Sequence, residues 1–143
     1  MDDKGVLTKE IFSSIGSNLE IWGNFFCEFG ENITIGDNVF LNSNCVILDL
    51  FKVSIGDNTS IGSNVGIFTS NHALDPKERM DHIEYGAPIS IGKSVWVGGN
   101  AVLLPGVDVG TGAVIAAGSV VTENIPPGHK YIVKNKETVI TNI

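Results

Sequence analysis

Cysteine, basic residues and long apolar runs are all scarce in this sequence. Only two cysteines occur among 143 residues, which excludes a disulfide framework, because such frameworks need more cysteines in a shorter chain. Nine Lys and Arg residues stand against sixteen Asp and Glu residues. The resulting net charge of −7 argues against a nucleic-acid partner, which needs a basic face. No apolar run approaches the length of a membrane span.

The start of the sequence is also poor in apolar residues. Its first ten residues, MDDKGVLTKE, are polar and lack the apolar segment of a signal peptide. We therefore expect a cytoplasmic, reduced protein without a membrane partner. Cys27 and Cys45 are expected to behave as small buried hydrophobic residues. The length fits a single domain that can bury its own core.

What the sequence has in abundance is a six-residue repeat. An aliphatic residue, or once a cysteine, recurs every six positions in fifteen hexads. These positions are Ile15, Ile21, Cys27, Ile35, Leu41, Ile47, Ile55, Ile61, Ile67, Ile91, Val97, Leu103, Val109, Ile115 and Val121. In twelve hexads the residue three positions later is Asn or Gly. They are Asn18, Asn24, Gly30, Asn38, Asn44, Asn58, Asn64, Asn100, Gly106, Gly112, Gly118 and Asn124.

The repeat predicts a sharp backbone bend in each hexad. Asn and Gly enter the left-handed region at little cost, whereas other residues lose roughly 1–2 kcal/mol there. Between bends, the alternation of residues such as Val39 and Leu41 predicts a short strand with both side chains facing inward. Three bends per revolution close a triangle, and five to six turns form a prism. The fold class is therefore all-β, a parallel β-helix with a column of stacked aliphatic residues inside.

The repeat also divides the chain. Residues 1–11 form a short N-terminal lead, residues 12–125 form the β-helix, and residues 126–143 form a C-terminal tail. The repeat breaks between Ile67 and Ile91, which predicts a loop excursion at residues 73–90 that protrudes from the prism.

Two stretches of sequence point to a known family. Residues 90–128, SIGKSVWVGGNAVLLPGVDVGTGAVIAAGSVVTENIPPG, resemble the hexapeptide-repeat acyltransferases, and so do NHALDPKERM and EYGAP in the loop. The resemblance extends over about residues 8–128 and is strongest to the maltose and galactoside O-acetyltransferases. It implies a left-handed β-helix, acetyl-CoA as cosubstrate, and a homotrimer with sites between subunits. The residues alone do not give the handedness.

The resemblance assigns roles to three catalytic candidates. His72 matches the family histidine and stands where the chain leaves for the loop. Imidazole titrates near neutral pH, so His72 can take the proton of an attacking hydroxyl as general base. Gly99 matches the backbone N–H donor to the oxyanion. Asn42 matches an Asn that holds the acceptor, and the bend rule does not explain it, because the bend residue of that hexad is Asn44.

The resemblance also implies a binding site for acetyl-CoA. Trp96 points outward from its strand and either lines the CoA channel or belongs to a subunit interface. Ala117 and Thr122 match positions that contact CoA. Relatives carry a Lys directly after that Thr, where this chain has Glu123, which repels phosphate. Either Lys130 or Lys134 replaces that Lys, or CoA binding is weak.

The acceptor remains open at this stage. The long N-terminal helical segment of maltose and galactoside acetyltransferases has only a short counterpart in this sequence. Phe40 and Leu50 replace polar sugar contacts, which indicates a less polar or differently shaped sugar-like acceptor. The sequence names neither this acceptor nor the acyl group, which is acetyl or another short acyl group.

Two other functions compete with acetyl transfer. The prism could be a non-catalytic assembly module, which the short N-terminus and Glu123 favour. A γ-carbonic-anhydrase-like metal enzyme is the other alternative. It needs three histidines around one zinc ion, and the chain has only His72, His82 and His129. Because two of these lie outside the regular repeat, no metal site is predicted.

Overall fold

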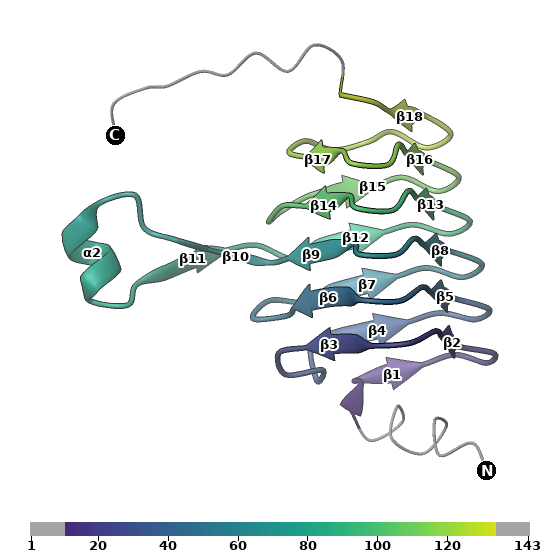
Figure 1. The fold of residues 1–143 in the computed structure, drawn as a ribbon, viewed down its shortest axis with the longest axis horizontal. Helices are drawn as coiled ribbons and strands as arrows, with labels where there is room; N and C mark the ends of the chain where they lie inside the picture. Colours follow the sequence, from purple (N-terminus) through teal and green to yellow (C-terminus); the bar gives the residue numbers. More distant parts are fainter. Residues whose placement is uncertain (1–10, 134–143) are drawn as a thin grey trace.

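The protein folds as a triangular prism of six stacked coils, seen in a computed structural model that describes residues 11–133 (Figure 1). Each coil runs through three parallel sheets in turn, which we call A, B and C. Sheet A contains β1 (Ser14–Ile15), β4 (Ile33–Ile35), β7 (Val53–Ile55), β12 (Ile89–Ile91) and β15 (Asp108–Val109). Sheet B contains β2 (Glu20–Ile21), β5 (Phe40–Leu41), β8 (Ser60–Ile61), β13 (Trp96–Val97), β16 (Val114–Ile115) and β18 (Lys130–Tyr131). Sheet C contains β3 (Phe25–Cys27), β6 (Cys45–Leu48), β9 (Gly66–Phe68), β14 (Val102–Leu103) and β17 (Val120–Val121).

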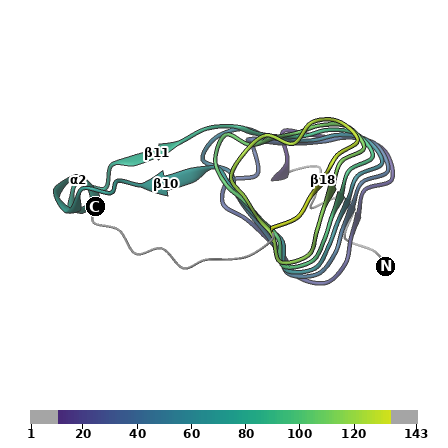
Figure 2. The same cartoon turned by 90° about the horizontal axis from the view of Figure 1, so that it is seen from above.

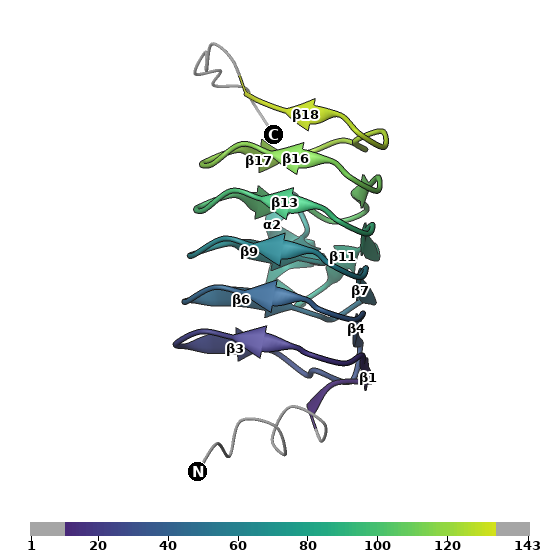
Figure 3. The same ribbon diagram turned by 90° about the vertical axis from the view of Figure 1, so that its right-hand side faces the viewer.

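The core is the aliphatic column that the repeat predicts. The coils lie one above another (Figure 3), and their corresponding residues pair in register. Each inward side chain therefore stacks on an inward side chain of the next coil. Leu41, Ile47 and Val97 are completely buried, and the other predicted inward residues from Ile35 onward are nearly so. In the first coil, the predicted inward residues are only partly buried: Ile15, Ile21 and Cys27. The prediction of an all-β parallel solenoid with an aliphatic interior is confirmed.

The corners use the left-handed conformation largely as predicted. Ten of the twelve predicted bend residues have positive φ, and the exceptions are Asn24 and Asn124. In the first of these hexads Gly23 takes the positive φ instead, at 71°, one residue earlier than predicted. Ser94 adopts φ 54° although it is neither Asn nor Gly. At the corners between sheets B and C, the side chains of Asn44, Asn64 and Asn100 form a hydrogen-bonded ladder.

An arm leaves the prism at the corner between sheets C and A (Figure 2). It consists of β10 (Ser70–His72), the short helix α2 (Pro76–Met80) and β11 (Glu84–Gly86), and β10 and β11 pair antiparallel. Asp75 caps α2, and the guanidinium of Arg79 donates to the carbonyls of Ala73 and Leu74 at 2.9 and 3.1 Å. The arm therefore stabilises its own tip, and α2 buries none of its residues. Within residues 11–133, no helix has the length and apolarity to cross a bilayer.

The three outer faces of the prism differ in chemistry. The outward row of sheet A is polar, with Ser14, Thr34, Ser54, Ser90 and Asp108 in register. The row of sheet C is apolar, with Phe26, Val46, Gly66, Val102 and Val120. The row of sheet B is mixed, with Glu20, Phe40, Ser60, Trp96, Val114 and Lys130.

Candidate active site

Three predicted site residues lie along one edge of the prism, the corner between sheets B and C, which we call the BC edge. Asn42 follows β5 in the second coil, Gly99 follows β13 in the fourth, and Ala117 follows β16 in the fifth. Backbone hydrogen bonds join these coils at the edge, including one from the Gly118 N–H to the Gly99 carbonyl at 2.9 Å. With about 4.8 Å between coils, Asn42 and Gly99 are about 10 Å apart along the edge.

The Asn42 carboxamide is oriented by its neighbour. Its Oδ1 accepts the backbone N–H of Ser43 at 2.8 Å and lies 3.5 Å from the Ser43 hydroxyl. The Nδ2 group donates to no acceptor within residues 11–133, so it is free to donate to a ligand hydroxyl. The orientation of the Asn42 carboxamide is therefore separate from the bend made by Asn44.

The backbone around Gly99 leaves an amide donor free. Two neighbouring glycines let the coils approach closely here, because a side chain at either position would collide with the backbone of an adjacent coil. A Cβ atom on Gly62 would lie 2.6 Å from the Gly99 nitrogen, and a Cβ atom on Gly98 would lie 2.5 Å from the Ala117 nitrogen. In the part of the chain that the structure describes, the Gly99 N–H donates to no acceptor. A free backbone N–H on a rigid corner is the donor that an oxyanion requires.

Two further candidates extend along sheet B beside this edge. The Trp96 side chain is 59% exposed on the outer face of β13. Lys130 lies on the same outward row two coils further on, because Trp96 pairs with Val114 and Val114 pairs with Lys130. An indole and an ammonium group therefore share one face toward the C-terminal end of the prism. Lys134, the other candidate phosphate partner, lies outside the described residues.

His72 and Thr122 lie at a different corner, between sheets C and A. His72 ends β10 on the arm, and its side chain is 64% exposed. Its cross-strand partner is Glu84, whose Oε1 is 3.9 Å from Nδ1 of the imidazole. Gly86 is two residues after Glu84 on β11, so both residues face the same side of the strand. A Cβ atom on Gly86 would lie 2.6 Å from the Phe51 ring, so Phe51 lies on that side. The imidazole thus lies on the side of the arm that Phe51 supports. Thr122 is exposed after β17.

The structure does not bring the two sets of residues together within one chain. A wall of sheet C separates the arm corner from the BC edge, and six nearly extended residues span about 15–20 Å. The arm carries His72 still further from the prism body (Figure 2). Asn42, Gly99, Ala117, Trp96 and Lys130 form one set, and His72 and Thr122 form the other.

The sequence reasoning missed Glu84 as a partner of His72. The antiparallel pairing within the arm has no hexad signal, so the repeat gives no indication of this contact. The pairing of His72 with Glu84 across twelve residues follows from the hairpin register alone.

Other reactive side chains stay apart from both sets. Burial raises the pKa of the Cys27 and Cys45 thiols, so both stay protonated and neither is an activated nucleophile. His82 lies in the arm with φ 57°, and the His129 ring bonds the Pro127 carbonyl at 2.8 Å. Residues 11–133 contain no group of three His, Cys, Asp or Glu side chains that could hold a metal ion.

These features define a hexapeptide-repeat β-solenoid with a histidine-bearing arm. Two family descriptions match the chain: bacterial transferase hexapeptide (six repeats) at residues 88–123, and hexapeptide repeat of succinyl-transferase at residues 52–70. The chain is 40% identical to galactoside O-acetyltransferase of Escherichia coli K12 over 121 residues, which are 85% of this chain and 60% of that protein.

Solved structures agree in fold. A maltose O-acetyltransferase from Clostridium difficile 630 matches 91% of this chain and 72% of its own, with 40% identity and a TM-score of 0.87. A hexapeptide-repeat acetyltransferase from Vibrio cholerae O1 biovar eltor, complexed with acetyl-CoA, matches 85% of this chain and 67% of its own, with 40% identity and a TM-score of 0.83. The chain belongs to the hexapeptide-repeat acetyltransferase family. It spans about 60–68% of the length of the curated relatives it matches.

Proposed function

We propose that this protein transfers an acetyl group from acetyl-CoA to a hydroxyl of a sugar-type acceptor. The observation that carries the proposal is the alignment of Asn42, the free Gly99 N–H and Ala117 along one edge. Relatives with 40% identity support the reaction class, since one is named a galactoside and another a maltose O-acetyltransferase. The relative from Vibrio cholerae supports acetyl-CoA as donor, because its structure contains that molecule.

The residues suggest a direct transfer. With Glu84 facing Nδ1, the Nε2 atom of His72 is the nitrogen free to take a proton. As the acceptor oxygen attacks the thioester carbon, its proton passes to Nε2 and the carbonyl oxygen becomes an oxyanion that the Gly99 N–H stabilises. The C–S bond then breaks, the proton passes from Nε2 to the sulfur, and an ester and free CoA leave. No acyl-enzyme forms, in keeping with the protonated thiols.

The order of residues along the BC edge gives the substrates a direction. The acceptor lies at Asn42, the thioester carbonyl at Gly99, and the pantetheine arm runs past Ala117 and Trp96. The nucleotide phosphates then reach Lys130 near the C-terminal end. Small residues suit this path, since a bulky side chain at Ala117 would block the close approach of the pantetheine arm to the backbone.

Because one chain keeps His72 away from the BC edge, we propose that the active site forms between copies in a homotrimer. Rotation about an axis parallel to the prism preserves height along it. The arm leaves between β9 of the third coil and β12 of the fourth, so a neighbour's His72 arrives between the heights of Asn42 and Gly99. Thr122 then faces the cofactor from the copy that supplies the arm. The apolar outer row of sheet C supplies the surface that subunits bury.

A CoA-release assay tests the proposal directly. The protein is incubated with acetyl-CoA and a panel of sugars and amino sugars, and the free thiol is measured. Acceptor-dependent release that disappears in His72→Ala supports the proposal. His82→Asn is the matched control, since it removes the other arm histidine and Asn tolerates the positive φ. Release that persists in His72→Ala would contradict the assigned base, and absence of CoA binding by calorimetry would contradict the reaction.

A further inference from the structure

We propose that Trp22 and Phe40 form a second-ring subsite next to Asn42, which binds the apolar face of a ring joined to the acetylated sugar. The ring is either another sugar or an aryl group, and both present the same flat apolar face. This inference rests on the proposed function, because Asn42 marks the place of the reacting sugar.

The two aromatic side chains form a pair that remains open on one side. Their ring centroids are 5.3 Å apart with an interplanar angle of 88°, an edge-to-face contact. The Trp22 side chain is nevertheless 58% exposed. A large indole held in place by Phe40 but exposed over more than half of its surface is a preformed platform, and covering it releases water from apolar surface.

The platform lies directly beside the proposed acceptor position. Trp22 occupies the same place in the first coil that Asn42 occupies in the second. The Trp22 N–H donates to the Leu41 carbonyl at 2.9 Å, which fixes the two corners one coil apart. A ring bound at Trp22 is therefore about 5 Å along the edge from one bound at Asn42, the separation of neighbouring rings in a glycoside.

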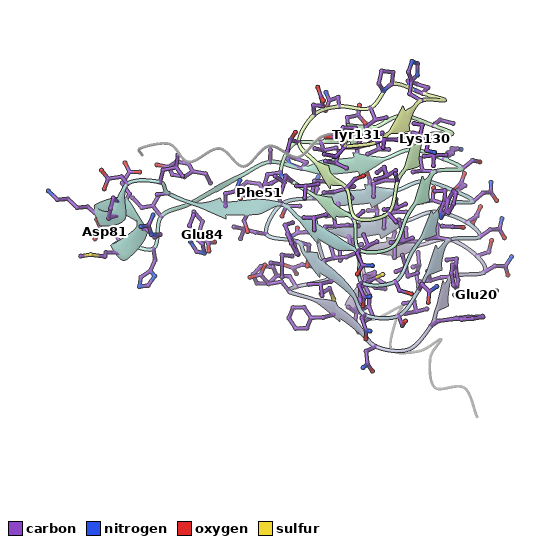
Figure 4. All side chains as sticks on the ribbon, turned by 45° about the horizontal axis from the view of Figure 1, so that its top comes forward. Glu20, Phe51, Asp81, Glu84, Lys130 and Tyr131 are labelled. Atoms are coloured by element: carbon purple, nitrogen blue, oxygen red, sulfur yellow. The ribbon has the colours of Figure 1, made fainter. Side chains whose placement is uncertain are left out.

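Polar groups at the rim favour a glycosidic ring over an entirely apolar partner. Glu20 is in register with Phe40 on the outer face of sheet B, and its carboxylate is exposed at the foot of the prism (Figure 4). Ser60 follows Phe40 in the same outward row. An aromatic platform bordered by a carboxylate and a hydroxyl offers an apolar surface for C–H groups and acceptors for hydroxyl hydrogens. The apolar row of sheet C differs in this respect, because it has no polar member.

The site also explains why the acceptor contacts predicted from the sequence are hydrophobic. The resemblance implies a polar sugar contact at position 40, whereas in this chain the Phe40 ring packs edge-to-face against Trp22. The expected acceptor therefore carries at least two rings, of which the first is acetylated and the second is bound through its apolar face.

Kinetics with matched acceptors test the subsite. Methyl, aryl and disaccharide glycosides of one reacting sugar are compared in wild type, Trp22→Ala and Trp22→Phe. We expect Trp22→Ala to raise KM about 5–20-fold for the aryl glycoside, the disaccharide or both, with kcat nearly unchanged. The methyl glycoside should be unaffected, and Trp22→Phe should restore most of the loss. The acceptor that responds identifies the second ring as aryl or sugar. An equal loss for the methyl glycoside, or no loss for any acceptor, would overturn the subsite.

A binding measurement separates this inference from the activity. The chain has two tryptophans, so Trp96→Phe leaves Trp22 as the sole tryptophan, which is excited selectively at wavelengths that Tyr85 and Tyr131 do not absorb. Titration with the disaccharide and the aryl glycoside should change its fluorescence saturably, even if no acetyl transfer occurs. If no ligand changes the fluorescence but dilution into monomers does, a second copy of the chain covers Trp22. The proposed subsite would then be wrong.

Discussion

The walls of the prism and the arm are built on opposite principles. From the second coil to the fifth, each wall strand buries its inward residue almost completely, as Ile61, Ile67 and Val97 show. The arm has a helix without a buried residue. Polar contacts hold the arm together: Asp75 caps the helix, the Arg79 guanidinium donates to the Ala73 carbonyl, and the Tyr85 hydroxyl donates to Glu78. Stability therefore resides in the walls, whereas the proposed catalytic base resides in the arm.

This difference teaches that function and stability can be changed separately in this fold. A substitution on the arm removes few contacts from the core, so it should alter activity without altering unfolding. A substitution inside a wall leaves a cavity between stacked coils, so it should alter unfolding first. The following predictions test that separation, beginning with the largest effect.

Removing the imidazole should have the largest effect on activity. His72→Ala should lower kcat about 10²–10⁴-fold, because general-base catalysis is lost. The unfolding temperature should stay within about a degree of wild type, since the side chain is 64% exposed. Steady-state kinetics and calorimetry on the same preparation measure both quantities. A large drop in unfolding temperature would show that the arm contributes to the stability of the walls.

The converse change belongs in the core. Ile67→Ala should lower the free energy of unfolding by about 2–5 kcal/mol, because Ile67 is buried between β6 and β14 and its loss leaves a cavity. Where the variant remains folded, kcat should fall less than threefold. Denaturant unfolding followed by circular dichroism gives the first value. A variant as stable as wild type would contradict the stacked-core account.

A smaller change on the arm should act through His72. Glu84→Gln should lower kcat about 2–5-fold without changing KM for either substrate, because a charge about 4 Å away is worth about 1 kcal/mol in water. Glu84→Asp should recover part of the loss. A change in KM alone would instead assign Glu84 to substrate binding.

The smallest effect is expected at the corner between sheets A and B, far from both sets of site residues. Lys93 Nζ lies 2.8 Å from the Asp57 carboxylate. This hydrogen bond is the main reason why the pKa of Asp57 lies below its ordinary value of 3.8, and a hydrogen bond from the Asp37 N–H is the second. Because the pKa of Asp57 is lower in the folded state than in the unfolded state, the ionised carboxylate stabilises the fold at pH values above its ordinary pKa. That stabilisation is lost as the pH falls through the lower pKa of the folded state.

Thermal unfolding of Lys93→Met should therefore show a slightly lower midpoint than wild type at pH 7, and this difference should shrink at pH 3. The hydrogen bond to Asp57 raises the pKa of Lys93 above 10.5, so its contribution persists through neutral pH. A difference that grows in acid would contradict the assignment. Activity at pH 7 should not change.

The sequence was most informative where backbone and core obey a repeat. Bend residues such as Asn38 and Gly106 identify the corners, because only a few residue types accept positive φ cheaply. Ser94 and Gly23 depart from the rule because neighbouring coils fix the corner even when the residue is unfavourable or shifted. Individual φ values within a corner depend on these contacts, which a repeat does not encode.

The candidate site was only partly accessible from sequence. Asn42 stood out because the bend rule left it unexplained. The structure shows its Oδ1 accepting the Ser43 N–H, while its Nδ2 has no acceptor among residues 11–133. The distance between His72 and the BC edge could not be predicted, because it depends on which corner the arm leaves. The pairing of His72 with Glu84 was also hidden, since it arises from an antiparallel hairpin outside the repeat.

The central claim is that a complete site needs His72 from one copy and the BC edge from another. His72→Ala removes the base, and Gly99→Trp blocks the edge with a bulky side chain. Each variant alone should be inactive as a folded oligomer. When they are dissociated, mixed equally and reassembled, about one quarter of the interfaces should join two intact halves, and activity should return to about that fraction of wild type. Mixed oligomers that form but remain as inactive as the separate variants would contradict the account.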